Sequence, residues 1–136
     1  MNDCLLDSSF VIDLLNEIAG GRDGPALAWL RRNPRARLWI SPVTLAEALE
    51  GAADVDAVGV YLARYAWQGI HRAHAGWVAA RQRGSARRMG ENDAWQCAIA
   101  QRMGAVIVGH DKAFKPLGAR YDDHRRTGAA SLRARH

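Results

Sequence analysis

The hydrophobic positions of this chain form two kinds of segment that alternate along the sequence. Short apolar runs at residues 4–6 and 105–108, and the mostly apolar run 36–40, are typical of buried strands in a parallel sheet. A further edge strand is expected near residues 120–122. The longer segments between the runs carry apolar residues at helical spacing. Strands that alternate with helices predict a parallel sheet that is covered on both faces.

Capping and turn residues mark where the helices begin and end. The first helix is expected to follow a cap at Ser8-Ser9 and to end at Gly20, and Ser41-Pro42 is typical of another helix start. The other expected helices are 25–33, 42–50, two helices between 54 and 90 with a break at 68–69, and 94–103.

Four carboxylates are expected at the same edge of this sheet. Asp7 and Asp111 come just after apolar strand ends, so both emerge at the carboxyl edge. Glu47 lies on the helix that starts at that edge after the strand 36–40. Asp93 opens the helix that leads into the last buried strand, and this end of the helix therefore lies at the carboxyl edge too. Four segments that are far apart in sequence would thus bring their acids to one place.

Acids gathered in this way indicate a particular chemistry. Like charges repel and raise one another's pKa, so a cluster of carboxylates persists mainly when a cation neutralises it. Oxygen ligands favour Mg²⁺ or Mn²⁺ over zinc. An ion of this kind with open positions activates water and neutralises the charge that builds up on a phosphodiester. The pattern therefore indicates phosphoryl transfer to water.

Each acid also has an ordinary structural explanation. Asp93 and Asp111 stand where helix N-caps are expected, and Glu47 is compatible with a solvated helix surface. Asp7 is the hardest to explain in this way, because a lone carboxylate after an apolar strand gains little by packing. Asp13, on the first helix, is interpreted as a surface or supporting acid rather than a ligand.

Length and composition are those of one ordinary globular domain. The 136 residues are 49% hydrophobic and 24% charged, and we expect a single domain over 1–136 with a flexible basic tail at about 125–136. No stretch approaches the roughly 20 apolar residues that span a bilayer, which predicts a cytoplasmic protein without a membrane partner. Cys4 and Cys97 are far apart in apolar settings and are expected to be buried thiols.

The net charge is +5, from 19 basic and 14 acidic residues. A positive balance suits a partner that carries phosphates, such as nucleic acid. Nearly all the basic residues are Arg, however, and a GC-biased genome would produce the same composition without such a partner. The basic stretch that contains Arg81, Arg83, Arg87 and Arg88 is suited to RNA phosphates and equally to a solvated helix surface.

Four motifs of this chain, taken in series, resemble those of the PIN-domain family and in particular of its VapC toxins. LLDSSFVIDLL is similar to the opening strand and turn of these domains, and SPVTLAEALEG is similar to their glutamate helix. ENDAWQCAIA and AVIVGHDKAF resemble their third and fourth acidic segments. Order, spacing and hydrophobic context agree over nearly the whole chain.

The resemblance implies a three-layer α/β/α sandwich with a central, mostly parallel sheet. It also implies an endoribonuclease that depends on Mg²⁺, with Mn²⁺ as the alternative ion, and that is commonly a homodimer and the toxin of a type II toxin–antitoxin pair. Carried over by position, Asp7 and Asp93 would be the principal metal ligands, and Glu47 and Asp111 would complete the catalytic site. RNA would be the substrate, and a cognate antitoxin would be the protein partner.

Two details concern the surroundings of the acids. Ser8 and Ser9 match the hydroxyl residues that follow the first acid in the family, where they can hydrogen-bond it. The family often has Thr or Ser two residues before the fourth acid, and this chain has Gly109 there. The missing hydroxyl leaves open how Asp111 is supported.

The histidines and tryptophans give weaker evidence for a functional site than the four acids do. His71 and His74 are one helical turn apart and lack a third ligand for zinc, so a solvated helix face is the simpler explanation. His110, beside Asp111, would either assist substrate binding or be an ordinary loop residue. A core role is favoured over base stacking for the tryptophans, which are Trp29, Trp39, Trp67, Trp77 and Trp95.

Alternative functions account for parts of the pattern. A catalytically inactive PIN-like nucleic-acid-binding module would keep the fold but would gain nothing from four acids in its phosphate groove, and a non-toxin PIN nuclease would keep the site. An aspartyl-phosphate enzyme also has an Asp after its first strand, but the dehalogenase type of phosphatase needs a second Asp where this chain has Ser9. A Ser-His-Asp hydrolase would need a G-x-S-x-G motif, which the chain lacks.

Overall fold

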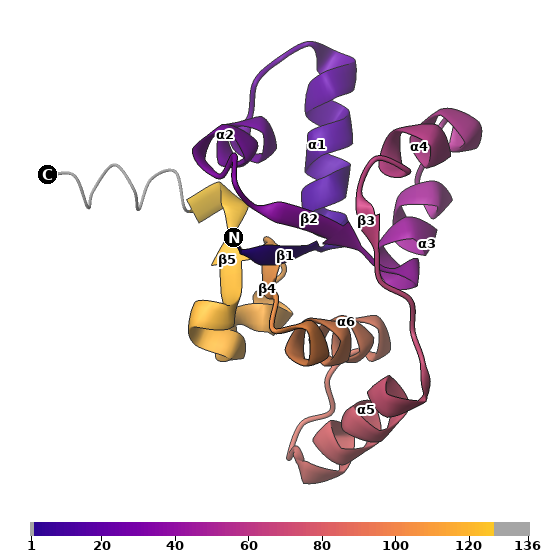
Figure 1. Ribbon diagram of the computed structural model, residues 1–136, viewed down its shortest axis with the longest axis vertical. Coiled ribbons are helices and arrows are strands. Elements are labelled where there is room, and N and C mark those ends of the chain that lie inside the picture. The colour runs from indigo at the N-terminus through magenta and orange to yellow at the C-terminus, as the bar shows by residue number, and fades with distance from the viewer. Residues whose placement is uncertain (1, 127–136) are drawn as a thin grey trace, which may run out of the picture.

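The computed structural model describes residues 2–126, which fold around a five-stranded sheet (Figure 1). The strands lie in the order β3-β2-β1-β4-β5, and every neighbouring pair is parallel. The strands are β1 (Asp3–Leu6), β2 (Arg37–Ile40), β3 (Ala66–Trp67), β4 (Val106–Gly109) and β5 (Tyr121–Asp123). The helices are α1 (Ser8–Gly20), α2 (Pro25–Arg32), α3 (Pro42–Glu50), α4 (Val55–Leu62), α5 (Arg72–Gly84), α6 (Glu91–Met103) and the 3-10 helix η1 (Lys112–Arg120).

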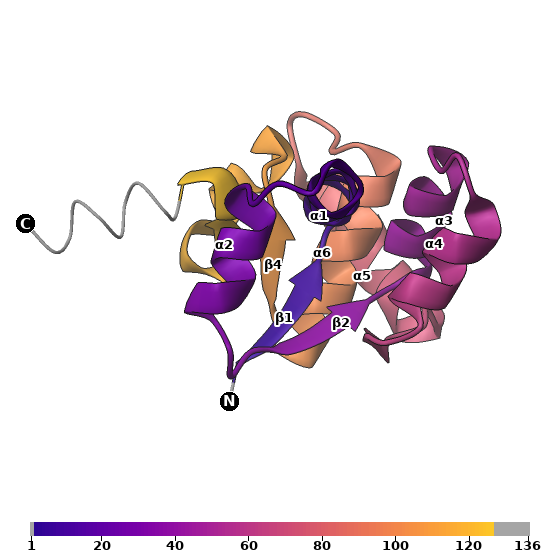
Figure 2. The ribbon, with the colours of Figure 1, turned by 90° about the horizontal axis from the view of Figure 1, so that it is seen from above.

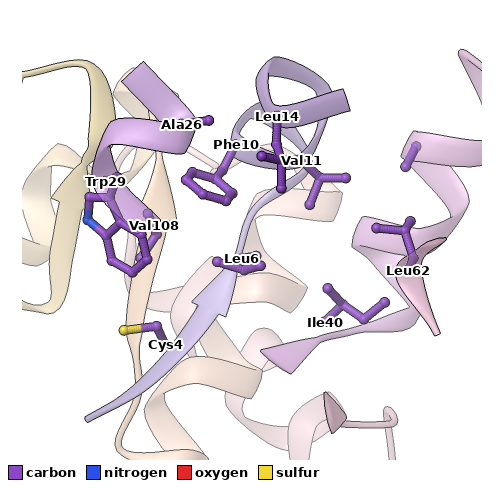
Figure 3. Close-up of a cluster of buried hydrophobic side chains, with 11 residues drawn as sticks. Cys4, Leu6, Phe10, Val11, Leu14, Ala26, Trp29, Ile40, Leu62 and Val108 are labelled. Atoms are coloured by element: carbon purple, nitrogen blue, oxygen red, sulfur yellow. The ribbon is translucent and has the colours of Figure 1, made fainter. Parts of the chain in front are cut away.

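Helices cover both faces of the sheet, so the expected three-layer α/β/α sandwich is confirmed. Figure 1 shows α1 and α2 on one side of the sheet and α5 and α6 on the other. Side chains of β1 alternate between two cores, because Cys4 and Leu6 pack with α1 and α2 whereas Leu5 packs with α6 and η1. In the first core, drawn in Figure 3, the rings of Phe10 and Trp29 meet edge to face with centroids 5.5 Å apart. Apolar residues on both faces explain the continuous apolar run of β1.

The strands β1, β2 and β4 end at the same edge of the sheet (Figure 2). Leu5 pairs with Trp39 of β2, and Leu6 pairs with Val108 of β4. The chain passes from β1 to β2 on one side and returns later to β4 on the other, so the strand order reverses at β1 and β4. Open parallel sheets bind ligands outside the carboxyl ends of their strands at such a point.

The two helices predicted in the segment 54–90 are confirmed as α4 and α5, but the sequence prediction missed the strand β3 between them. β3 has two residues, which is too few to show any periodicity, and it exists because Ala66 pairs with Trp39 of β2. The predicted break at 68–69 lies between this strand and α5.

Two helix caps also differ from the prediction, and the expected tail is not tested. Asp7 rather than a serine caps α1, since its side chain accepts a hydrogen bond from the backbone N–H of Ser9. α6 begins at Glu91 after Gly90, which leaves Asp93 inside the first turn instead of at the cap. The predicted edge strand is confirmed as β5. Most of the expected basic tail, from residue 127 onward, lies outside the described residues.

α2 begins beside a carboxylate of α1. Glu17 accepts hydrogen bonds from the backbone N–H groups of Gly24, Ala26 and Leu27 at 2.8, 2.9 and 2.9 Å. A Cβ on Gly24 would lie 2.6 Å from Cδ of Glu17, so glycine lets this carboxylate approach the N-terminus of α2 closely. A negative charge at a helix N-terminus is also favourable. Glu17 therefore joins α1 to α2 above the sheet.

The thiols are buried as expected. Cys4 and Cys97 are free, and burial raises the pKa of Cys4 to about 11 and that of Cys97 to about 12. Over residues 2–126, no helix combines the length and the apolar character that crossing a membrane requires.

Candidate metal centre

Asp7 directly follows β1, and only 3% of its surface is exposed. Its Oδ2 accepts hydrogen bonds from the backbone N–H and the hydroxyl of Ser9 at 3.2 and 2.7 Å. Its Oδ1 accepts a longer hydrogen bond from Nε2 of Gln96 at 3.4 Å. A buried carboxylate is costly unless it is paired or hydrogen-bonded. Donors from α1 and α6 therefore hold Asp7 at the carboxyl edge of the sheet.

Glu47 lies on α3, which starts just after β2. The hydroxyl of Ser8 donates a hydrogen bond to Oε1 of Glu47 at 3.0 Å. The expectation that Ser8 and Ser9 both hydrogen-bond the first acid is thus correct only for Ser9. Ser8 and Ser9 therefore hydrogen-bond two different acids from the beginning of α1.

The pKa of Asp93, in the first turn of α6, is raised to about 6. The causes of this shift indicate that the other acids lie nearby. Burial is the largest cause, and the negative charges of Asp111, Asp7 and Glu47 follow. A hydrogen bond to the carboxyl group of Asp111 adds to the effect. Charges act strongly only at short range in salt solution. The four acids are therefore neighbours, and we call Asp7, Glu47, Asp93 and Asp111 the acidic cluster.

The acidic cluster is a set of neighbours rather than a preformed chelate. Among residues 2–126, no three His, Cys, Asp or Glu side chains converge tightly enough to hold a metal ion as they stand. Like charges without a cation favour separation, and Asp7, Glu47 and Asp111 each accept hydrogen bonds from other groups. A carboxylate oxygen has two lone pairs, so Oδ1 of Asp7, Oε1 of Glu47 and Oδ1 of Asp111, with one donor each, still leave room for a cation. The oxygen-only, negatively charged donor set fits Mg²⁺ or Mn²⁺.

A buried polar network that the sequence analysis did not identify supports Asp7. The hydroxyl of Ser41 donates to Oε1 of Gln96 at 2.7 Å, and Nε2 of Gln96 donates to Oγ1 of Thr44 at 2.7 Å. Thr44 in turn donates to the backbone carbonyl of Leu6 at 2.7 Å. The three polar side chains are buried. A glutamine within the apolar stretch AWQCAIA was the available signal, because a buried amide needs partners.

Asp13 is paired with basic residues near the end of β5. Arg125 donates to its Oδ2 and Oδ1 at 2.9 and 2.8 Å, and Nε2 of His124 lies 2.7 Å from Oδ2. Burial opposes ionisation, but hydrogen bonds from Arg125 and His124 hold the pKa of Asp13 below its ordinary value. Nε2 of His110 is 3.8 Å from the same carboxylate. Asp13 therefore joins α1 to the chain after β5, as a supporting acid would.

Sequence comparison assigns this architecture to a family. The family model described as PIN domain matches residues 4–119. The chain belongs to the PIN-domain family. Nucleases of this family generally use a divalent metal ion, which agrees with the oxygen-only ligands of this PIN domain. No curated protein sequence matches the chain.

Solved structures with the same fold come from toxin–antitoxin complexes. A chain of a toxin–antitoxin complex from Klebsiella pneumoniae is 20% identical with a TM-score of 0.73, over 89% of this PIN domain and 97% of that chain. A chain of VapBC-1 from nontypeable Haemophilus influenzae is 21% identical with a TM-score of 0.67, over 90% and 98%. A chain of DNA-bound VapBC from Salmonella typhimurium is 18% identical with a TM-score of 0.67, over 91% and 99%. At these identities the likeness concerns the fold.

The basic stretch of this PIN domain leads into the N-terminus of α6, the helix that carries Asp93. Arg83, Arg87 and Arg88 are exposed, and Arg88 pairs with Glu91 at 2.7 Å. The stretch leads to Gly90, where a Cβ would lie 3.4 Å from Oδ2 of Asp93. The exposed arginines therefore lie in the segment that leads into the first turn of α6, where Asp93 stands.

The expected solvated face is confirmed for His71, which is exposed, but not for His74. His74 is buried, and its Nδ1 accepts a hydrogen bond from the backbone N–H of His71 at 3.0 Å, which helps to cap α5. Burial lowers the pKa of His74. Of the tryptophans, Trp29 is buried in the core as expected, whereas Trp67 on β3 is 51% exposed.

Proposed function

We propose that this chain is an endoribonuclease that depends on Mg²⁺ or Mn²⁺ and that it is the toxin of a type II toxin–antitoxin pair. The acidic cluster carries the proposal, because burial and then the negative charges of Asp111, Asp7 and Glu47, which come from three other segments, raise the pKa of Asp93 to about 6. Membership of the PIN-domain family supports nuclease activity. The similar folds in VapBC complexes support the role of a toxin.

The acids have distinct roles in this proposal. Asp7 and Asp93 hold the cation, and Glu47 and Asp111 complete the catalytic site. When bound, the ion supplies an activated water and positive charge for the phosphodiester. Because metal ligands must be ionised, the raised pKa of Asp93 makes cation binding depend on a proton leaving this carboxyl group near pH 6.

Other residues of the chain prepare the acids for this task. Ser9 and Gln96 hydrogen-bond the two oxygens of Asp7, and Ser8 hydrogen-bonds Glu47. Side chains that are held in one orientation lose little freedom when a ligand binds, which favours binding. The hydrogen bonds therefore favour a site that needs only small movements to close around an ion.

RNA is the substrate that the charge distribution supports. The net charge is +5, and the exposed Arg83, Arg87 and Arg88 precede in the chain the helix that carries Asp93. Arg side chains bind phosphate oxygens with charge-assisted hydrogen bonds. A strand of RNA would thus contact the basic stretch while one of its phosphodiesters lies at the acids.

A cognate antitoxin is expected to inhibit the chain by placing an Arg or Lys side chain in the acidic cluster. Such a cation would neutralise the carboxylates in place of the metal and would exclude the substrate. A structure of the complex tests this expectation. Guanidinium or ammonium nitrogens within hydrogen-bond distance of Asp7 or Asp93 would support it. A complex in which the cluster is open and holds a divalent ion would contradict it.

A homodimer is part of the proposal. Ile12 and Ile18 of α1 and Val55 and Val60 of α4 are exposed. A largely apolar groove of about 460 Å³ lies between α1 and the α3–α4 segment. Apolar side chains of this kind gain free energy when another protein surface covers them.

The first test of the proposed function is cleavage of RNA by the purified chain in Mg²⁺. Discrete fragments are expected from structured RNAs and none from DNA of the same sequence. A catalytically inactive binding module would instead retain RNA without cutting it, and that result would contradict the proposal. A non-toxin PIN nuclease would cut RNA but would have no partner that inhibits it.

A further inference from the structure

Gly109 stands where the PIN-domain family often has a hydroxyl residue, and its surroundings explain the glycine. A Cβ on Gly109 would lie 2.6 Å from Oγ of Ser9, 2.9 Å from Cβ of Asp7 and 3.2 Å from Oδ2 of Asp7. Real Cβ atoms essentially never approach other atoms within 3.0 Å. The φ angle of Gly109 is not positive, so its backbone conformation does not call for glycine. Glycine is needed at this position for space.

The hydroxyl of Ser9 fills that space and bridges two strand ends. It donates a hydrogen bond to Oδ2 of Asp7 at 2.7 Å. It also accepts a hydrogen bond from the backbone N–H of His110 at 3.0 Å. The hydroxyl therefore connects the acid that follows β1 to the chain that follows β4. Both of its bonds would be disturbed by a side chain at position 109.

We propose that Ser9 is a positioning residue for the cation site, and that it supplies from α1 the hydroxyl that position 109 lacks. Ser9 fixes Oδ2 of Asp7 while Gln96 donates to Oδ1, so the carboxylate plane is held from both sides. With Ser9 and Asp7 placed as they are in this structure, the hydroxyl at position 9 and a side chain at position 109 exclude each other. The positioning role rests on the proposed function, because it requires a bound cation. The steric exclusion between positions 9 and 109 does not depend on that function.

Cation affinity tests the positioning role. Ser9→Ala is expected to weaken Mn²⁺ binding by roughly 10-fold, the lower end of the losses seen when groups that orient metal ligands are removed. Ser9→Thr keeps the hydroxyl and is expected to retain most of the affinity. Ser85→Ala is the matched control, because its hydroxyl donates to the carbonyl of Arg81 at 2.7 Å in another part of the chain. Isothermal titration calorimetry measures all four proteins.

Two results would overturn the positioning role. One is equal Mn²⁺ affinity in the wild type and in Ser9→Ala. The other is a loss in Ser9→Thr as large as the loss in Ser9→Ala, since the hydroxyl would then not be the group that matters. A weaker affinity in Ser9→Ala alone, with Ser9→Thr and Ser85→Ala near the wild type, supports it.

The mutual exclusion is tested without any metal. Denaturant unfolding in EDTA compares Gly109→Ala in the wild type with Gly109→Ala in Ser9→Ala. The midpoint is expected to fall less in the second background, because the 2.6 Å contact with Oγ is gone. Equal falls in both backgrounds overturn the exclusion. If the wild type binds no Mn²⁺, the metal site of the proposed function fails and the positioning role fails with it, while this cycle still decides whether the two positions exclude each other.

Discussion

Excess EDTA is expected to abolish cleavage of RNA by this chain. The acidic cluster places four carboxylates together, and without a cation their negative charge repels a phosphodiester. The carboxylates also supply no electrophile for the phosphate. A metal ion contributes several kcal/mol to such a transition state, so the rate should fall by at least roughly 100-fold. Time courses of fragment formation from a structured RNA measure the loss.

The control for this experiment is EDTA that has been saturated with Mg²⁺ before it is added, which should leave cleavage unchanged. Restoring free Mg²⁺ or Mn²⁺ after chelation should restore the rate. Cleavage that continues at full rate in excess EDTA would remove the metal from the proposal.

Asp93→Asn is expected to abolish cleavage and to leave the metal-free protein at least as stable as the wild type. The substitution keeps the shape of the side chain and removes one of the four neighbouring negative charges. Asp93 lies in the first turn of α6 but is not its cap, so the helix loses only a dipole interaction of about 0.5 kcal/mol. A neutral amide avoids both the repulsion between carboxylates and the cost of burying a charge. This gain in the free energy of unfolding should exceed the dipole loss by roughly 1 kcal/mol at neutral pH, after allowance for partial exposure.

The pH dependence of this gain follows from the direction of the shift. The folded protein holds the proton of Asp93 up to about pH 6, whereas the ordinary value is 3.8. Below the ordinary value both states are protonated and Asp93 carries no penalty. As pH rises from there to about 6, only the unfolded state releases the proton, so the free energy of unfolding falls. In EDTA, the gain in the free energy of unfolding from Asp93→Asn should therefore be full above about pH 6 and absent near pH 4.

Thermal melts in EDTA and in saturating Mg²⁺ measure both halves of this expectation. Mg²⁺ should stabilise the wild type by mass action and should stabilise Asp93→Asn markedly less. The matched control is Asp56→Asn, the same substitution in the first turn of α4, which should keep both cleavage and the response to Mg²⁺. If Asp93→Asn melted well below the wild type in EDTA, Asp93 would be chiefly structural, and the proposed site would lose one of its two main ligands.

Much of the fold was predictable because it depends on local patterns. The short apolar runs predicted β1, β2 and β4, and the positions of glycine, proline and serine predicted most helix ends. The acids were predictable as a group for the same reason. Asp7 and Asp111 follow strands, and parallel strands bring their carboxyl ends to one edge. Their role in catalysis stays a prediction until the variants are measured.

Contacts between distant residues could not be predicted in this way. β3 exists only because Ala66 pairs with β2, and its two residues carry no pattern of their own. The N-terminus of α2 is bound by Glu17 of α1, which looks like an ordinary surface acid in the sequence. In each case the partner is chosen by the packing of separate elements.

The sequence by itself determined the order of strands and helices apart from β3, and the edge at which the acids lie, because both follow from periodicity and from the direction of parallel strands. Only the tertiary structure decided how the acids are held. Gln96 reaches Asp7 from 89 positions away, and Ser9 and Gly109 share one small space at the ends of β1 and β4. Hydrogen bonds and close contacts of this kind depend on distances of a few tenths of an ångström between segments, and no local pattern of residue types encodes them.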